Sequence, residues 1–261
     1  MNPGDTRESE LLLGGRWLPV TTTVLFINAS VERCAYELVH GVRGEYLASK
    51  FGHQPFVTTQ VRAEEGLAGL LGELLPLEIP ENRRTLFAPT TNPRWTAMFT
   101  SDWRGQDPHS PMLWFAQGRI ASVLVSEAPH SPSLAGYRAS YGERKIEMYE
   151  IPPEGEAIGH TLGVRATGIN KWEVAGGSGR FPGGSLWDPS ARIVRDRFTH
   201  YHLAAMCERL GLHPFDEDFY APGGSGILVT RTDPTPRDWP RISLAQARGE
   251  APLNLSEANA L

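Results

Sequence analysis

The sequence predicts an α+β domain, built on a mainly antiparallel sheet with helices packed on one face. Three observations lead to this fold class. Hydrophobic residues make up 40% and charged residues 21% of the 261-residue chain, which is typical of a globular protein. The predicted elements run strand–helix–strand–helix, then as a series of short strands, then as one helix and one strand, an order typical of α+β folds. No internal repeat interrupts this order.

The first third of the chain alternates predicted strands and helices. The first strand is rich in β-branched and aromatic side chains. Ser30 can cap the helix that follows it, while Gly41 and Gly44 weaken the continuation of that helix. In order, this part predicts a strand at 22–28, a helix that begins near residue 31, a strand at 56–61 and a helix at 64–75.

From residue 85 onward the pattern changes to short strands between turns. One strong helix interrupts them, with Asp188 as its cap, Pro189 at its first position and Gly211 just past its end. The predicted strands are 85–88, 95–100, 120–127, 145–151, 163–169, 171–175 and 226–230.

The domain organisation follows from the same patterning. Residues 10–232 predict a single domain, because either half alone offers a thin core. Residues 1–9 predict a loose N-terminal tail, and residues 233–261 predict a proline-rich C-terminal tail. Cys34 and Cys207 form neither a disulfide framework nor a zinc pattern. With no apolar run near the roughly 18 residues that span a bilayer, we expect a cytoplasmic protein with no membrane partner.

Composition and motifs exclude several other roles. The net charge of −5 and the absence of a basic stripe disfavour nucleic acid as a partner. The glycine-rich segment 176–184 is followed by no lysine and lies in no βαβ unit, so we expect no nucleotide cofactor. His200 and His202 are two residues apart, a spacing that does not bring two ligands together on a helix, and we expect no metal site.

The most unusual segment extends from Trp95 to Trp114. It holds three of the seven tryptophans, and a polar loop with acids and an arginine lies between them. Tryptophan and arginine dominate binding hot spots. The alternative is that the tryptophans pack in the core and the loop is a wide turn. The candidate binding residues are Trp95, Asp102, Trp103, Arg104 and Asp107.

Three segments together resemble a group of uncharacterised bacterial proteins that are similar to immunity proteins of toxin systems. The first is Arg94–Phe99 with Gly105, Asp107 and Pro108, and the second is Tyr141-Gly142 with Ile146-Glu147. The third begins at Arg195–Thr199 and leads through Leu210–Leu212 to Pro214–Asp216 and Phe219-Tyr220. The resemblance spans residues 85–220. It implies a bacterial protein and carries no established activity.

These observations leave three function classes open. The first is a non-enzymatic module that binds another protein, as an immunity protein does with a toxin. The acidic net charge suits a basic partner, because complementary charge speeds association. The second is a small hydrolase or transferase that pairs His109, His160 or His200 with Asp102, Asp107 or Asp196. The third is a structural subunit of an assembly, which would show a long exposed strand edge or a docked tail. The sequence does not indicate an oligomeric state.

Overall fold

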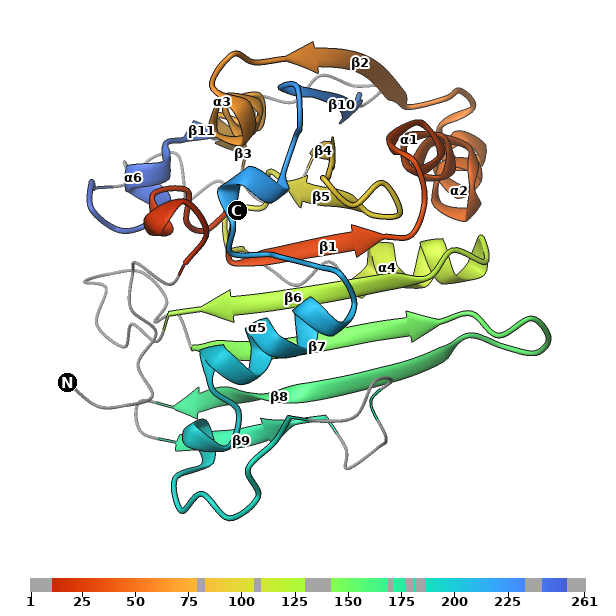
Figure 1. Ribbon diagram of the computed structural model, residues 1–261. Coiled ribbons are helices and arrows are strands. Elements are labelled where there is room, and N and C mark those ends of the chain that lie inside the picture. The colour runs from red at the N-terminus through yellow and green to blue at the C-terminus, as the bar shows by residue number, and fades with distance from the viewer. Residues whose placement is uncertain are drawn as a thin grey trace.

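The computed structural model describes residues 11–78, 83–105, 109–129, 142–168, 171–176, 181, 186–232 and 241–252 (Figure 1). Within these residues, nine strands form one sheet in which every strand pair is antiparallel, and several helices pack on it. The predicted α+β class with a mainly antiparallel sheet is therefore confirmed. The predicted N-terminal tail, residues 1–9, lies outside the described residues.

The sheet has the strand order β2–β10–β4–β5–β1–β6–β7–β8–β9. Its second half is a meander, because β6 to β9 pair in the order of the chain. Its first half is interleaved, since β10 from near the C-terminus inserts between β2 and β4. The strands are β1 (Thr23–Ile27), β2 (Phe56–Arg62), β4 (Arg84–Pro89), β5 (Thr96–Thr100), β6 (Ser122–Ala128), β7 (Glu143–Glu150), β8 (Ile158–Gly168), β9 (Lys171–Ala175) and β10 (Ser225–Arg231).

Helices cover both faces of this sheet, whereas the sequence predicted helices on one face. The reason lies in the central strands, which are apolar on both sides. In β1, Val24 and Phe26 pack into one core cluster, and Leu25 and Ile27 pack into another on the opposite face. Because successive side chains of a strand point to opposite faces, each face needs its own cover.

We name the two sheet faces after their helices. The α1 face carries α1 (Val31–His40), α2 (Val42–Phe51) and α4 (His109–Gln117). The α5 face carries α3 (Gly66–Gly72) and α5 (His200–Arg209). In Figure 1, α5 crosses in front of β7, whereas α4 lies behind β6. No helix among the described residues is long and apolar enough to cross a membrane.

The helix α1 begins where the sequence predicts, because the Ser30 hydroxyl accepts a hydrogen bond from the Arg33 N–H at 3.2 Å. After α1 ends, the chain becomes helical again within two residues. Gly41 ends α1 in an extended conformation and α2 follows at once. Gly44 lies against α1, since a Cβ on Gly44 would be 1.7 Å from the Val39 carbonyl oxygen. This glycine lets the two helices touch backbone to backbone.

The last long helix starts later than predicted. The Asp188 carboxylate accepts hydrogen bonds from the N–H and hydroxyl of Ser190, which forms a local turn and not a helix cap. The chain then forms a short 3₁₀ helix, Val194–Arg197, and Thr199 caps α5. The predicted end is confirmed, because Gly211 follows α5 with a φ of +69°.

The smaller elements lie at the sheet's margins. Within the predicted C-terminal tail, β11 (Arg241–Ile242) pairs with β3 (Leu77–Glu78), and α6 (Leu244–Ala247) follows. The Arg248 guanidinium donates to the Arg16 carbonyl oxygen, near the other end of the described chain. Two further 3₁₀ helices are Leu12–Gly15 and Glu217–Phe219.

Candidate functional site

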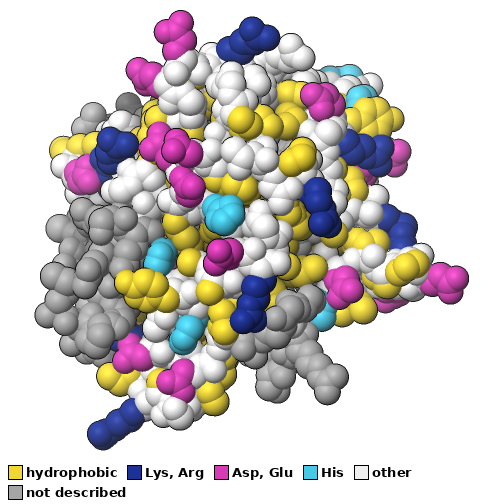
Figure 2. All heavy atoms as spheres, in the orientation of Figure 1, with side chains coloured by type: hydrophobic (Ala, Val, Ile, Leu, Met, Phe, Trp, Pro, Cys, Tyr) yellow, Lys and Arg dark blue, Asp and Glu magenta, His cyan; other side chains and the backbone are white. Residues whose placement is uncertain are grey.

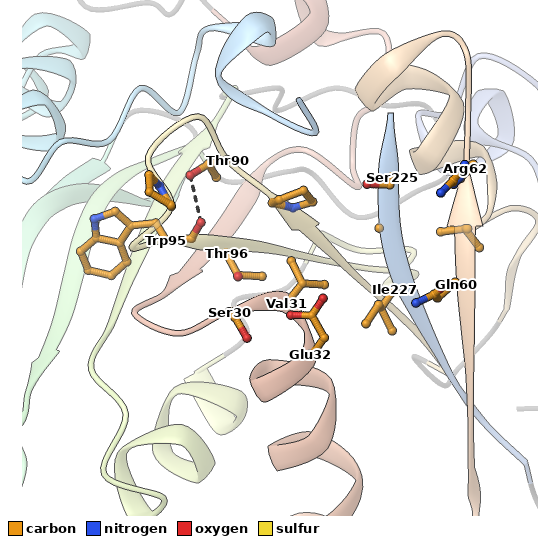
Figure 3. Close-up of a pocket in the computed structure, with 14 residues that line it drawn as sticks. Ser30, Val31, Glu32, Gln60, Arg62, Thr90, Trp95, Thr96, Ser225 and Ile227 are labelled. Carbon is orange, nitrogen blue, oxygen red and sulfur yellow. Dashed lines mark hydrogen bonds between the residues drawn. The ribbon is translucent and has the colours of Figure 1, made fainter. Parts of the chain in front are cut away.

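The predicted binding residue Trp95 lies in the core. Only 6% of it is exposed, and its indole N–H donates a hydrogen bond to the Leu210 carbonyl oxygen at 3.2 Å. This bond satisfies the orphan carbonyl at the end of α5. Trp95 therefore ties the start of β5 to the last turn of α5, and it also lines the cavity shown in Figure 3.

Local contacts hold the described part of the polar loop after β5, residues 101–105. The Asp102 carboxylate accepts a hydrogen bond from the Arg104 N–H at 2.7 Å. The Arg104 guanidinium carbon lies 4.6 Å from the centroid of the Trp103 ring, and Trp103 is half-buried against the core of the α5 face. Thr22 also contacts the loop. Its hydroxyl lies 3.1 Å from the Gly105 carbonyl oxygen and can donate a hydrogen bond to it. Asp107 lies outside the described residues.

Of the predicted binding residues, Asp102 lines a cavity that we call the arginine pocket. It has a volume of about 250 Å³ and lies on the α1 face, between α2, α4 and the ends of β4 and β10. Arg43, Arg83 and Arg231 line it together with Asp102 and Trp114. Arg83 is held in place, because it donates to the Arg231 carbonyl oxygen at 3.0 and 3.2 Å. Arginines outnumber acids in the lining, and one of them, Arg83, also pairs with Glu78 at 3.7 Å.

Beside the arginine pocket, α2 and α4 present a cation held by two aromatic rings. The Arg43 guanidinium carbon lies 5.1 Å from the Trp114 ring centroid and 5.8 Å from that of Tyr46. Partial burial lowers the pKa of Arg43, although an arginine stays protonated at any physiological pH. Tyr46 is 57% exposed, so this group is open to the surface.

A second arginine–aromatic group lies on α1, where Arg33 also pairs with Glu37 at 2.9 Å. The Arg33 guanidinium carbon is 5.6 Å from the Tyr36 ring centroid, and the Tyr36 and His40 rings are 4.8 Å apart. Tyr36 is 56% exposed. Because α1 and α2 touch at Gly44, the two groups stand on adjoining helices. We call the whole set the α1–α2–α4 surface, made of Arg33, Tyr36, His40, Arg43, Tyr46, Leu113 and Trp114.

A second cavity, with a volume of about 420 Å³, lies in front of the N-terminus of α1 (Figure 3). Ser30, Val31 and Glu32 line one side of it, and Gln60 and Arg62 of β2 line the other. Several of its polar groups already serve the fold. The Thr90 hydroxyl lies 2.8 and 2.9 Å from the Asn92 and Trp95 carbonyl oxygens of its own turn and can donate its proton to either. The Thr96 hydroxyl donates to the Ala29 carbonyl oxygen at 2.7 Å.

The histidines of the enzyme hypothesis lie near glutamates. His109 lies 3.4 Å from a Glu147 oxygen on the α1 face. On the α5 face, whose histidine side chains stand among apolar and acidic ones in Figure 2, His160 lies 3.4 Å from Glu150 and His200 lies 3.5 Å from Glu127.

The predicted aspartate partners lie elsewhere. Asp102 faces the arginine pocket, Asp196 is near Arg195 at 3.6 Å, and Asp107 lies outside the described residues. The three histidines thus stand in three separate places. In the part of the chain that the structure describes, no three His, Cys, Asp or Glu side chains group as metal ligands.

Both cysteines are free and fully buried. Burial raises the pKa of the Cys34 thiol to about 12. Burial and the nearby charge of Glu127 raise the pKa of Cys207 still further. Because the thiolate is the nucleophilic form, neither side chain is a nucleophile at neutral pH.

These raised pKa values predict how stability depends on pH. Unfolded thiols lose their protons near pH 8.5, whereas the folded thiols keep theirs, so the folded state binds more protons at alkaline pH. The contribution of the thiols is complete below pH 8.5. Above about pH 9 we expect the free energy of unfolding to fall by about 1.4 kcal/mol per pH unit for each thiol. Urea unfolding between pH 8 and pH 11 measures this slope. The slope of Cys34→Ala should be shallower, and an equal slope in both proteins would contradict the assignment.

Comparisons with known proteins give no further guidance. The chain matches no family model, no curated protein and no solved structure. The resemblance to uncharacterised bacterial proteins over residues 85–220 therefore stays a prediction, and the function rests on the geometry of the chain itself.

Proposed function

We propose that this protein binds another protein through the α1–α2–α4 surface. The observation that carries the proposal is Arg43, a cation held between the Tyr46 and Trp114 rings at the rim of the arginine pocket. Tyrosine, tryptophan and arginine are the side chains that dominate binding hot spots. The flanking rings also hold the Arg43 side chain in place, so less conformational entropy is lost when a partner binds.

The chemistry of this surface favours an acidic segment of the partner. A carboxylate that enters the arginine pocket meets the lining residues Arg43, Arg83 and Arg231 and the acid Asp102, while Glu78 pairs with Arg83 at 3.7 Å. Arginine pairs with carboxylates through two parallel hydrogen bonds, which adds specificity to charge attraction. The net charge of −5 suits a basic partner, but the charges at the point of contact decide the pairing, and at this pocket they are positive.

The finer parts of the proposal concern the partner and the compartment. The sequence resemblance supports a toxin as the partner, with this protein as its immunity protein. Two free, buried thiols support a reducing compartment, and the proposal places the binding in the cytoplasm. Co-purification with the product of the adjacent gene tests the choice of partner. The charge-reversal variants Arg43→Glu and Arg192→Glu test where on this protein the partner binds.

Charge reversal at the centre of the surface tests the proposal. Arg43→Glu replaces the aromatic-held cation with an anion, and we expect the partner's dissociation constant to rise at least about 30-fold, as for a hot-spot residue worth 2 kcal/mol. The measurement is affinity capture from a lysate of the source cells, followed by titration of the captured protein against purified wild type and variant. Because charge attraction contributes, binding of the wild type should also weaken as the salt concentration rises.

The matched control is Arg192→Glu. Arg192 is exposed and precedes the 3₁₀ helix on the α5 face, on the opposite side of the sheet. Arg192→Glu makes the same change of charge, and we expect this variant to bind the partner as the wild type does. A partner lost equally from both variants, or kept by both, would contradict binding at the α1–α2–α4 surface.

A further inference from the structure

The strand β2 forms one margin of the nine-stranded sheet. Figure 1 shows β2 at the top of the molecule, with the rest of the sheet on one side of it. Among the described residues, no strand pairs with the edge that faces away from β10. Most of the strand is exposed, and the Val57 side chain has an exposed fraction of 52%. An open edge of this kind can template pairing with another strand.

The hydrogen bonds at both ends of β2 show which backbone groups face outward. The Ala63 N–H donates to the Gly224 carbonyl oxygen, and the Thr232 N–H donates to the Pro55 carbonyl oxygen. In an antiparallel ladder these bonds recur at every second residue, so Val57, Thr59 and Val61 bond to β10. The N–H and carbonyl groups of the alternate residues therefore point to the open side: Phe56, Thr58, Gln60 and Arg62.

The other margin of the sheet differs in kind. The strand β9 is shorter and carries the charged residues Lys171 and Glu173. Its pairing with β8 is interrupted by a register shift between Ala166 and Gly168. Charges, short length and bulges are the devices that protect a strand edge from pairing. In β2 none of the residues from Phe56 to Val61 is charged or a proline, and the pairing of β2 with β10 has no register shift.

We propose that a second copy of this chain pairs with β2, antiparallel, about a two-fold axis at Thr59. The two sheets would then join into one continuous sheet. With the two-fold axis at Thr59, each of the seven residues of the strand has a partner on the other copy. The outward-facing backbone groups then lie opposite one another. Axes at Thr58 or Gln60 leave residues at the ends without partners.

The side chains of β2 are self-complementary in this register. On the α5 face, Val57 lies opposite the partner's Val61, and Thr59 lies opposite the partner's Thr59. On the α1 face, Thr58 lies opposite the partner's Gln60, which it can hydrogen-bond, and Phe56 lies opposite the partner's Arg62, which suits a cation–π contact. No like charges face each other. This complementarity favours a second copy over an unrelated strand.

Sedimentation velocity over a concentration series tests the proposal. We expect the wild-type protein to form dimers as its concentration rises, and Thr59→Lys to raise the dissociation constant at least tenfold, because the two new charges face each other at the axis. Thermal unfolding checks that the variant is folded. A wild-type protein that sediments as a monomer at every concentration would overturn the proposal.

Cross-linking through single cysteines tests the register directly, without a variant that disrupts the dimer. Directly opposed residues of antiparallel strands lie within disulfide reach, whereas residues several positions from the axis do not. Under mild oxidation we therefore expect Thr59→Cys to form a covalent dimer rapidly and Val57→Cys, on the same side of the strand, to form one slowly. Equal rates would overturn the register. Arg43→Glu should leave dimerisation unchanged, and Thr59→Lys should leave partner capture unchanged. Each of the two proposals can therefore be refuted independently of the other.

Discussion

Replacing Arg144 by methionine is expected to lower the free energy of unfolding by about 3–5 kcal/mol. Arg144 and Glu127 form an ion pair between β6 and β7, with exposed fractions of 4% and 3%. The Arg144 Nε lies 2.9 and 3.0 Å from the two Glu127 oxygens, and its Nη1 donates to the Phe198 carbonyl oxygen at 3.0 Å. The methionine keeps most of the volume but leaves the Glu127 carboxylate buried without this arginine.

The matched control is the double variant Glu127→Leu with Arg144→Met. It removes both charges, and replacing a buried ion pair by apolar side chains is often neutral or stabilising. Urea unfolding, followed by tryptophan fluorescence, should therefore give the double variant more stability than Arg144→Met alone. A single variant within about 1 kcal/mol of the wild type would show that the pair is solvated and that the packing of α5 over β7 does not depend on it.

Replacing Gly44 by alanine is expected to separate α1 from α2. The added Cβ would lie 1.7 Å from the Val39 carbonyl oxygen and 3.2 Å from that of Leu38. Because the atoms in the way belong to backbone, the helices have to move, at a cost of about 1–3 kcal/mol or more. We also expect weaker capture of the partner, since this contact sets the position of Arg43 relative to Tyr36.

Gly72→Ala is the control for this substitution. Gly72 is the last residue of α3, is exposed and has no atom within 4 Å of an added Cβ. Alanine has the higher helix propensity, so the free energy of unfolding should rise by up to about 1 kcal/mol. If the two alanine variants changed stability in the same direction and by the same amount, the close approach of α1 and α2 would be refuted.

The strands were largely predictable from local pattern, and some helices were not. The strand predicted at 56–61 matches β2, and the one at 226–230 lies inside β10, because β-branched residues between turns identify a strand by themselves. The helix α2 was missed because it buries only Gly44 and Leu47 and has no apolar stripe. In α4 the apolar residues are consecutive and follow Pro111, so no helical period is visible.

The candidate site was predictable only in part. The clustering of tryptophans identified the loop at Asp102, and Asp102 lines the arginine pocket. The same signal selected Trp95, which is buried and also lines the cavity in front of α1. Arg43 was not selected, since its significance depends on Trp114, which is distant in sequence and is brought to it by the packing of α2 and α4.

Site-specific photo-cross-linking tests the proposed binding surface most directly. Tyr46, at 57% exposure on α2, is replaced by the photoreactive residue p-benzoylphenylalanine, and Tyr201, at 74% exposure on α5, is replaced in a control protein. After irradiation in the source cells, we predict a covalent adduct with a second, different polypeptide from position 46 and none from position 201. An adduct from position 201 alone, or from neither position, would contradict binding through the α1–α2–α4 surface.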